Sequence, residues 1–443
     1  MKRNLALVLC IALVLALFVG CASNEQPVQQ QGAEPSGDGG AASGEASGTI
    51  DFRYWGAEQD EIMQQIANDF MAQNSNIKVT ATLEPNDQFW TKILTSIAAK
   101  QPAADVCWIN PTYAVQMMNN NQLECVQDLY DSGKVDRSKF VEGALQSYTG
   151  SDGKLYAVPK DFQTVCLIYN KGIFDEVGLP YPGDDYTWDQ MVSDAQKLVK
   201  KEGDKITRYG FVHNASVMSS WFVYCYTNGG SLFKPEENGG KYVDTPENRE
   251  AFQKAADLIF KYQVAPDGSV TTETTGDEMF MNEMVAMTAY VPAQIENYSK
   301  VLGDKVGVAC FPYMKEKATI TNCLGYGIPA GTKNLAAAKE FLAYLSSEAG
   351  QAPQSKAMIP AYKGIVSDME TKFKDMGFKT YLDAGDYAIP TPVEQYSGNA
   401  ARKAIETEVS NILFGTKDVT TAIQDAEKGI IEAVEKAKSE MGS

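Results

Sequence analysis

The sequence predicts an α/β protein with two lobes, and three observations support this prediction. The chain has 443 residues, which is more than one ordinary domain contains. Stretches with the patterns of strands and helices alternate from residue 49 onward, an order typical of mostly parallel sheets covered by helices. The alternation starts again after residue 160, which indicates a second unit of the same kind.

The first unit begins with strand and helix patterns in turn. Alternating or β-branched residues predict three strands, at residues 49–55, 77–84 and 104–109. Ile62, Ile66 and Phe70 recur every four residues and form the stripe of an amphipathic helix. A second helix is expected over residues 89–99. Parallel strands joined by such helices form a sheet that is covered on both faces.

The second unit repeats this pattern with longer helices. Apolar runs predict four strands, at residues 164–170, 208–212, 284–291 and 306–313. Helices are expected at residues 187–201, where Thr187 is a suitable N-cap, and at residues 245–263, where Thr245 precedes a proline. From residue 335 onward the chain is expected to be mainly helical.

The composition excludes several classes of function. The net charge is −18, so nucleic-acid binding is not expected, because phosphate recognition depends on clustered Lys and Arg. His213 is the only histidine, which excludes a histidine-rich zinc site and leaves one base for a Ser-His-Asp triad. No phosphate-binding loop, nucleophile elbow or metalloprotease motif occurs, and no cofactor or metal is expected. A glycosidase stays open, because 57 acidic residues offer many carboxylate pairs.

The N-terminal residues have the pattern of an export signal. Two basic residues precede an apolar run that ends at Gly20 and is too short to favour a membrane-spanning helix. The sequence LFVGC resembles a bacterial lipobox, in which Cys21 becomes the lipid-modified first residue. Residues 1–20 are therefore expected to be a lipoprotein signal peptide. Residues 21–48 lack large apolar side chains and are expected to form a flexible tether on the outer face of a membrane.

Six further cysteines lie beyond the signal and the anchor: Cys107, Cys125, Cys166, Cys225, Cys310 and Cys323. Export would permit disulfides, but no C-x-x-C spacing occurs and several of these cysteines lie in apolar strand-like runs. We expect mostly free, buried thiols. Cys310 and Cys323 are the pair to test first for a disulfide.

Aromatic residues near strand ends suggest a binding cleft. Trp55 follows the first strand, Trp108 lies in the third, and Trp221 precedes a Gly-Gly pair. Flat aromatic faces stack on the apolar faces of sugar rings, while polar side chains bind the hydroxyls. Each tryptophan also suits a hydrophobic core, which is the commoner role and the one expected for Trp188. Two facing α/β lobes would hold a solute beyond the carboxyl ends of their strands.

Several segments, in order, resemble the extracellular solute-binding proteins of ABC importers, specifically their carbohydrate-binding branch. They are FRYWG, PAADVCWI, GKLYAVPKDFQTVCLIYNKGIFDEVGLPYP, WFVYCYTNGGSLF, FMNEMVAMTAYVPAQI, LGYGIPAGTKNLAAAKEFLAYLSSEAGQ and LFGTKDVTTAIQDAEKGI. Together they span the chain from residue 50 onward. The resemblance implies a periplasmic-binding-protein-like fold of type II, with two lobes of mixed sheets and helices, a hinge and a central ligand cleft.

The resemblance also implies how the chain is divided and what it does. Lobe 1 is expected to contain residues 49–158 plus about 288–330, and lobe 2 residues 159–287 plus about 331–443. The protein is expected to be a monomeric, lipid-anchored receptor that binds a carbohydrate ligand without catalysis and delivers it to the membrane subunits of an ABC permease. A receptor for another small solute, such as a polyamine, a peptide or a metal complex, and a secreted glycosidase remain as alternatives.

Ten positions that match the family pattern are the candidate ligand-binding residues: Trp55, Gln59, Asn110, Asp161, Phe162, Trp221, Asn228, Tyr290, Tyr326 and Tyr396. The family commonly has a Gly-x-Trp near Tyr290, which this chain lacks, so Tyr290 is the candidate for that stacking role. Asp161 is expected to accept hydrogen bonds from ligand hydroxyls rather than to act as a general acid, because a charged acceptor strengthens such bonds.

Overall fold

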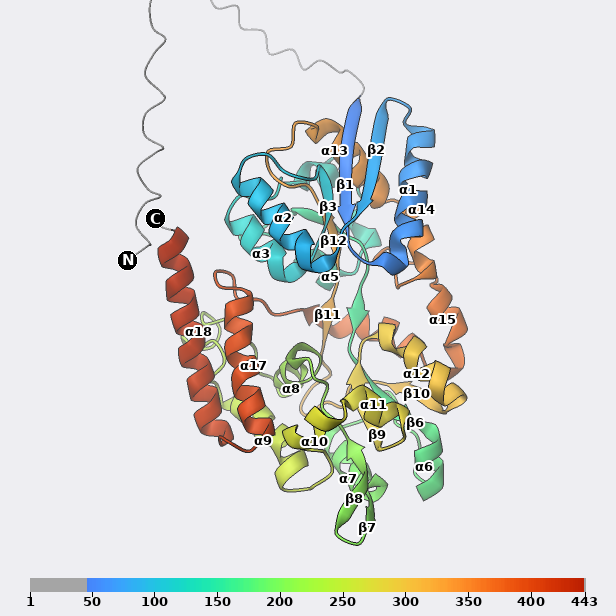
Figure 1. The fold of residues 1–443 in the computed structure, drawn as a ribbon, viewed down its shortest axis with the longest axis vertical. Helices are drawn as coiled ribbons and strands as arrows, with labels where there is room; N and C mark the ends of the chain where they lie inside the picture. Colours follow the sequence, from blue (N-terminus) through green and yellow to red (C-terminus); the bar gives the residue numbers. More distant parts are fainter. Residues whose placement is uncertain (1–45, 442–443) are drawn as a thin grey trace, which may run out of the picture. The chain divides into compact units, whose positions relative to one another are not determined.

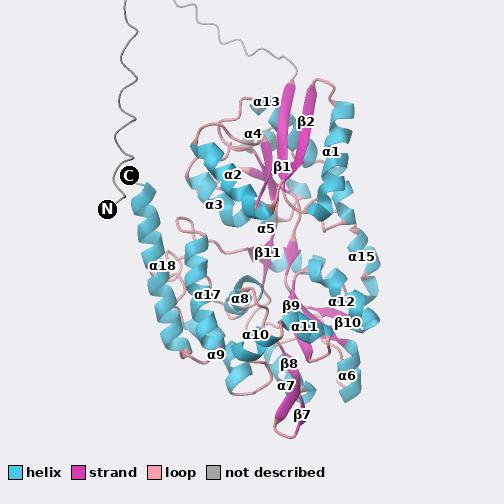
Figure 2. Ribbon diagram, viewed as in Figure 1, coloured by secondary structure: helices cyan, strands magenta, loops and turns pink. Residues whose placement is uncertain are grey.

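The computed structural model describes residues 46–441, which form two α/β lobes joined by a small third sheet (Figure 1). Helices and strands alternate in both lobes (Figure 2), so the predicted fold class is confirmed. The expected signal peptide (residues 1–20), the anchor Cys21 and most of the expected tether (residues 21–48) lie outside the described residues.

The sheet of lobe 1 has five strands in a mixed arrangement. Their order across the sheet is β2 (Ile77–Leu83), β1 (Gly48–Tyr54), β3 (Val106–Ile109), β12 (Gly325–Gly327) and β4 (Ala157–Pro159). β1 pairs in parallel with β2 and β3, whereas β12 runs antiparallel to both β3 and β4. The three strands predicted for the first unit are therefore present and adjacent.

Helices cover both faces of this sheet. α1 (Asp60–Gln73) and α13 (Leu335–Leu345) share a core with Phe52 and Trp108. α2 (Asn86–Ala98) and α3 (Pro111–Asn119) pack on the other face with Cys107 and Ile109. The alternation of Trp108 and Cys107 between the two cores follows from the two-residue period of a strand. Three short helices complete the lobe: α4 (Gln127–Asp131), α5 (Glu142–Gln146) and α14 (Glu348–Gln351).

The sheet of lobe 2 also has five strands, in the order β10 (Val306–Ala309), β6 (Cys166–Asn170), β9 (Val285–Tyr290), β8 (Lys205–Phe211) and β7 (Lys200–Glu202). The helices of lobe 2 contribute to two hydrophobic cores, one on each face of this sheet. They are α6 (Lys171–Val177), α7 (Trp188–Leu198), α8 (Trp221–Thr227), α9 (Pro246–Phe260), α10 (Gly268–Glu273), α11 (Gly276–Met281), α12 (Ile295–Leu302), α17 (Asn399–Leu413) and α18 (Val419–Met441). Thr187 and Thr245 cap α7 and α9 as the sequence predicts.

A three-stranded sheet forms the hinge between the lobes. It contains β5 (Gln163–Thr164), β11 (Thr319–Asn322) and β13 (Ala388–Pro390), with β11 in the middle. β5 carries the chain from lobe 1 into lobe 2, and β11 returns it. The Thr319 hydroxyl accepts a hydrogen bond from the Val165 amide (3.1 Å) and donates one to the Val165 carbonyl (2.8 Å), so side chains reinforce the short strands. Two short helices lie before β13: α15 (Asp368–Lys372) and α16 (Lys379–Asp383).

The strand pairings divide the chain differently from the sequence-based expectation. β9 and β10 pair with β6 in lobe 2, although residues from about 288 to 330 were expected in lobe 1. Of the strands in that range, only β12 joins the sheet of lobe 1. α13 packs against β1 in lobe 1, although residues 331–443 were expected in lobe 2. A local strand or helix pattern does not reveal its partner, because pairing depends on residues far away in the chain.

All six cysteines of the described residues are free. Cys310 donates toward the carbonyl of Gly183, and Cys323 toward the carbonyl of Ala144 in lobe 1. The disulfide suggested for this pair is therefore absent. Burial raises the pKa of the Cys323 thiol to about 12, which keeps it protonated at neutral pH.

Candidate ligand-binding site

The carboxyl ends of the lobe 1 strands lie at the edge of the sheet nearest the hinge. β4 is antiparallel to β12, and β12 is antiparallel to β3, so β4 and β3 run in the same direction. β1 is parallel to β3. β4 ends at Pro159, four residues before the hinge strand β5 begins. The residues that follow β1 and β3 therefore face the hinge side of lobe 1.

The same holds for lobe 2. β8 and β9 are parallel, and β10 runs in the same direction because both β10 and β9 are antiparallel to β6. Tyr290, the last residue of β9, pairs with Cys166, the first residue of β6 after the hinge. Both lobes thus present the carboxyl ends of parallel strands toward the hinge, which is where open α/β sheets bind ligands.

Three aromatic residues at this edge of lobe 1 form what we call the aromatic platform: Trp55, Trp90 and Tyr113. Trp55 directly follows β1, while Trp90 and Tyr113 lie in the first turns of α2 and α3. The Trp90 and Tyr113 rings stack with centroids 3.9 Å apart, and Trp55 lies 5.3 Å from Trp90. Trp55 and Tyr113 are partly exposed. Such ring faces can stack on the apolar face of a polar ligand.

The charged groups beside the platform are paired with each other. Glu84, the residue after β2, forms ion pairs with Arg53 and with Lys92, the latter at 2.6 Å. Asp60 accepts a hydrogen bond of 2.5 Å from the Tyr54 hydroxyl, and burial together with this bond raises the pKa of Tyr54. Glu84 thus engages both Arg53 and Lys92, and Asp60 is engaged by Tyr54, so these four charged side chains are held by partners within lobe 1.

Asn110 and Gln59 come from the two loops next to the platform. The Asn110 side-chain oxygen accepts a hydrogen bond from the Thr112 amide at 2.9 Å and so caps α3. Gln59 is buried, and its side-chain oxygen accepts a hydrogen bond from the Lys160 ammonium at 2.9 Å. Asn110 is partly exposed at the edge, whereas Gln59 serves the interior of the lobe.

Asp161 lies inside the junction between lobe 1 and the hinge. Its side chain is 1% exposed. Oδ1 accepts a hydrogen bond from the Leu324 amide at 2.9 Å, and Oδ2 accepts one from Lys160 at 3.0 Å. Both oxygens are thus engaged within the protein, which differs from the expected role of a hydroxyl acceptor open to a ligand. In this conformation Asp161 stabilises the hinge junction.

Residues 65–378 match the family model of bacterial extracellular solute-binding proteins. The chain belongs to this family. The resemblance noted in the sequence is therefore confirmed.

The similar proteins and solved structures include other solute-binding proteins. An arabinooligosaccharide-binding protein of Halalkalibacterium halodurans is 25% identical over 285 residues, which cover 60% of each chain. A galactooligosaccharide-binding protein of Bacillus subtilis is 23% identical and covers 69% of this chain and 70% of its own.

Among solved structures, an ABC substrate-binding protein of Listeria monocytogenes in complex with cycloalternan has a TM-score of 0.74 to this solute-binding protein. The two are 22% identical, and the match covers 87% of this chain and 99% of the other. This likeness supports the two-lobe fold. Within residues 46–441, none of the helices combines the length and apolarity that a membrane crossing requires.

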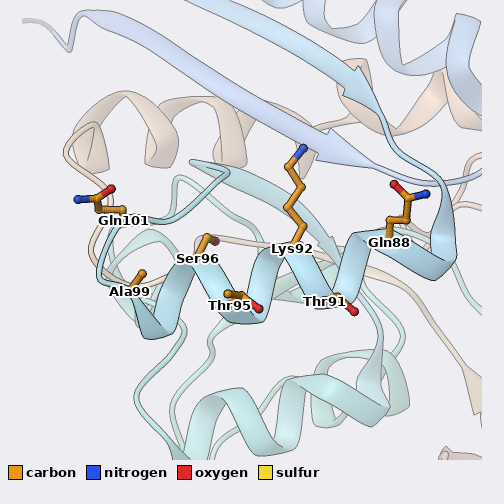
Figure 3. A pocket seen from close by; sticks show the side chains of 7 residues that line it. All are labelled: Gln88, Thr91, Lys92, Thr95, Ser96, Ala99 and Gln101. Carbon is orange, nitrogen blue, oxygen red and sulfur yellow. The ribbon is translucent and has the colours of Figure 1, made fainter. Parts of the chain in front are cut away.

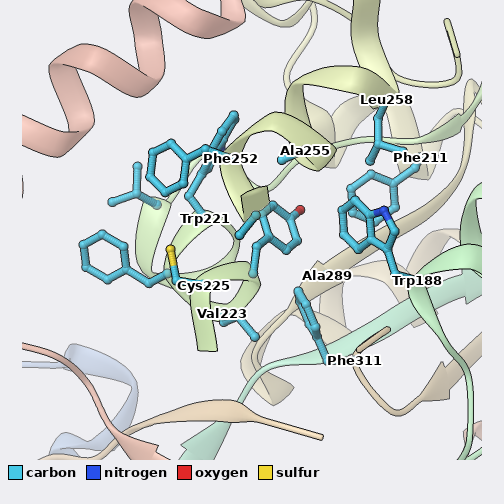
Figure 4. Packing of buried hydrophobic residues seen from close by; sticks show 14 of the residues in the cluster. Trp188, Phe211, Trp221, Val223, Cys225, Phe252, Ala255, Leu258, Ala289 and Phe311 are labelled. Carbon is cyan, nitrogen blue, oxygen red and sulfur yellow. The ribbon is translucent and has the colours of Figure 1, made fainter. Parts of the chain in front are cut away.

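Three of the candidate residues of this solute-binding protein are fully buried within the lobes. Trp221 is 0% exposed and packs edge-on against Phe252 at 5.0 Å. Figure 4 shows both residues within the hydrophobic cluster. Asn228 is buried at the end of α8 and donates hydrogen bonds to the Glu247 carbonyl (2.8 Å) and to Glu250 (3.0 Å). Tyr326 is buried in lobe 1, where burial raises its pKa. These positions stabilise the lobes and expose no surface to a ligand in this conformation.

The other three candidates differ in position: Tyr290 ends a strand, Phe162 lies between β4 and β5, and Tyr396 lies just before α17. Tyr290 ends β9 and is partly exposed, and burial of part of its ring raises its pKa, so its hydroxyl is neutral at neutral pH. Phe162 is mostly buried beside the hinge. The Tyr396 ring is covered by Lys438, whose ammonium lies 4.4 Å from its centre. Tyr290 is thus the lobe 2 residue best placed to complement the platform.

The lobes also contact each other through α3. Gln116 donates a hydrogen bond to the Tyr396 carbonyl at 3.1 Å, and Asn119 donates one to the Gln395 carbonyl at 2.8 Å. The acceptors lie just before α17, which packs in lobe 2. These contacts and the roles of Trp90, Tyr113 and Lys160 do not emerge from the sequence. The one available signal was the position of Tyr113, three residues after Asn110 at a strand end.

Two hollows do not include the platform rings in their lining: one lies on α2, the helix that carries Trp90, and one lies beside the hinge. A surface hollow of about 620 Å³ is lined by polar side chains of α2, among them Gln88, Lys92 and Ser96, which Figure 3 labels. A larger cavity of about 790 Å³ lies beside the hinge and is lined in part by Phe162 and Tyr362. We call it the hinge cavity. Its lining includes neither Trp55 nor Tyr290, so it is separate from the strand ends that define the candidate site.

Proposed function

We propose that this solute-binding protein is a receptor for a neutral sugar or oligosaccharide, which it holds between its lobes and delivers to an ABC permease without catalysing a reaction. The aromatic platform beyond the carboxyl ends of β1, β2 and β3 is the observation that carries this proposal. A partly exposed Trp55 next to a stacked Trp90–Tyr113 pair offers ring faces of the kind that sugars contact. Asn110 and Tyr290 supply polar groups at the two facing edges.

The ion pairs near the platform and the names of similar proteins support a sugar ligand over the alternative solutes. Relatives of the chain include proteins named for arabinooligosaccharide, galactooligosaccharide and sn-glycerol-3-phosphate binding. A phosphate ligand requires an available cation, but Arg53 and Lys92 are both paired with Glu84 beside the platform. An uncharged ligand needs hydrogen bonds and stacking alone, which these residues provide.

The location proposed for the receptor is the outer face of the membrane. The LFVGC sequence supports lipid attachment at Cys21 after removal of residues 1–20. Metabolic labelling of the full chain with a fatty-acid probe in a bacterial host tests this step. Label that is lost in Cys21→Ala supports the anchor, and labelling that persists in that variant contradicts it.

Thermal unfolding of the purified full chain with a panel of solutes tests the ligand class. The panel contains arabinotriose, galactotriose and cycloalternan, with sn-glycerol-3-phosphate and spermidine as charged comparisons. A ligand present at about 100 times its Kd stabilises the folded state by about 2.7 kcal/mol, which raises the Tm measurably. We expect such a rise with at least one neutral sugar. A rise only with a charged solute contradicts the proposal.

A further inference from the structure

Lys160 is a buried cation at the junction of lobe 1 and the hinge. It is 0% exposed and lies between β4 and β5. Its ammonium group donates hydrogen bonds to Gln59 at 2.9 Å and to Asp161 at 3.0 Å, and it lies 4.2 Å from the centre of the Trp108 ring. The ammonium group also lies 2.7 Å from the Met358 sulfur. A fully buried ammonium group needs such partners, and together they fix its position.

Two of these partners support the aromatic platform. Gln59 is the last residue of a short helical turn, Ala57–Gln59, that begins two residues after Trp55. Trp108 lies beneath the platform, with its ring centroid 5.3 Å from that of Trp55 in an edge-to-face arrangement. A shift of the Trp55 ring is therefore resisted by Trp108 and by the turn that follows Trp55. Both are held by the ammonium group of Lys160.

A third partner belongs to the hinge. Asp161 accepts the Lys160 hydrogen bond through Oδ2, and through Oδ1 it accepts the hydrogen bond of the Leu324 amide at 2.9 Å. The Lys160 amide in turn donates to the Leu324 carbonyl at 2.8 Å. Leu324 lies between the hinge strand β11 and the lobe 1 strand β12. The lobe 1 ends of two hinge crossings, before β5 and after β11, are thus tied together at this pair.

We propose that Lys160 is a positioning residue that couples ligand stacking on Trp55 to the conformation of the hinge. The inference rests on the proposed function for the identity of the ligand, but the contacts that carry it are present without one. Lys160 contacts no ligand itself. It acts through Gln59 and Trp108 on the platform side and through Asp161 on the hinge side, so the two sides move as one unit.

The test separates positioning from simple structural support by removing both charges together. Lys160→Met alone leaves the Asp161 carboxylate buried without its cation, which destabilises the fold for reasons unrelated to coupling. The double variant Lys160→Met with Asp161→Asn keeps an oxygen for the Leu324 amide and removes the unpaired charge. We expect its Tm to recover most of the loss of the single variant, while its contacts to Gln59 and Trp108 stay lost.

The measurements are the Kd for galactotriose and arabinotriose by calorimetry and the change in radius of gyration on binding by X-ray scattering. We expect the double variant to bind at least about tenfold more weakly than the wild type, an effect of the size typical of coupling between contacting groups. We also expect a smaller change in its radius of gyration on binding. The matched control is Arg208→Met with Glu176→Gln, which removes an ion pair in lobe 2, and its Kd should equal that of the wild type. Wild-type affinity and wild-type closure in the Lys160 double variant would overturn the proposal.

Hydrogen exchange of the ligand-free protein keeps this result independent of the ligand. In the Lys160 double variant, amides of the turn at residues 57–59 and of Leu324 should exchange faster together, with unchanged exchange in the control. If none of the neutral sugars of the thermal-unfolding panel binds the wild type, the proposed function fails, and the exchange result still decides the role of Lys160. Unchanged exchange at either segment contradicts the coupling.

Discussion

Trp55 and Trp221 have the same chemistry but opposite surroundings. Trp55 follows β1 directly, remains partly exposed and belongs to the aromatic platform. Trp221 begins α8, is 0% exposed and is packed against His213 and Phe252. The platform lies at the carboxyl edge of a sheet, whereas Trp221 is covered by α9. A tryptophan near a loop is thus a candidate ligand contact only where no helix covers it.

The largest expected effect is the loss of stability on substitution of the buried Trp221. Trp221→Ala should lower the free energy of unfolding by about 3–5 kcal/mol, because it leaves a large cavity in the core of lobe 2. Urea unfolding followed by circular dichroism measures this loss. At temperatures where the variant is folded, its sugar affinity should match that of the wild type. A stable variant with lost affinity would place Trp221 in the binding site instead.

The pKa of His213 tests whether water is excluded from this core. Burial lowers the pKa of His213 from 6.5 to about 4, and its Nδ1 lies 3.0 Å from the Tyr224 hydroxyl. The folded protein therefore keeps the ring neutral down to pH 4, while the unfolded chain takes up a proton near pH 6.5. Stability should fall as the pH falls through this window, by about 3 kcal/mol in total from this group.

The single histidine makes this prediction directly measurable. An NMR titration of the imidazole carbon-bound protons reports on His213 alone, because the chain has no other histidine. A transition near pH 4, or none before acid unfolding, agrees with the buried position. A transition near pH 6.5 in the folded protein contradicts it and would open this part of lobe 2 to solvent.

Substitution of the partly exposed Trp55 is expected to affect sugar affinity more than stability. Trp55→Ala should weaken sugar binding by about tenfold, since loss of a stacking aromatic anchor costs more than about 1 kcal/mol of binding free energy. Its unfolding free energy should change less than that of Trp221→Ala. Calorimetric titration measures the affinity. The control is Tyr362→Ala in the hinge cavity, which should bind as tightly as the wild type; a larger loss in the control would move the site to that cavity.

The smallest expected effect concerns Tyr113, the platform ring that stacks on Trp90. Tyr113→Leu keeps an apolar side chain in the first turn of α3 but removes the parallel stack with Trp90, whose centroid is 3.9 Å away. Affinity should fall by about threefold, in the range of a single aromatic contact. Competition binding against the wild type resolves this difference. An unchanged affinity would restrict the ligand contact to Trp55.

Much of the fold was predictable because strand and helix periods are local properties. The alternation in residues 49–109 predicted β1, β2 and β3, and Thr187 and Thr245 marked two helix starts. The hinge was not predictable in the same way. Residues 164–170 read as one strand, but Thr164 pairs with Thr321 in the hinge, and Cys166 pairs with Tyr290 in lobe 2. These partners lie far away in the chain.

The candidate site was predictable only where a residue ends a strand or directly follows one. Trp55 and Asn110 follow strands and Tyr290 ends one, and the structure places all three at edges that face the hinge. Trp90 lies on an amphipathic helix, where an aromatic residue is indistinguishable from a core residue by its pattern. In the sequence, Asp161 stands out as an acceptor for ligand hydroxyls. Its neighbour Lys160, which does not stand out there, makes the more extensive set of buried contacts.

A crystal structure of the full chain with a bound neutral oligosaccharide tests the central claim most directly. The account predicts a sugar ring stacked on Trp55, with Asn110 or Tyr290 within hydrogen-bonding distance of its hydroxyls. A ligand bound in the hinge cavity beside Tyr362, with the Trp55 ring uncovered, would contradict it.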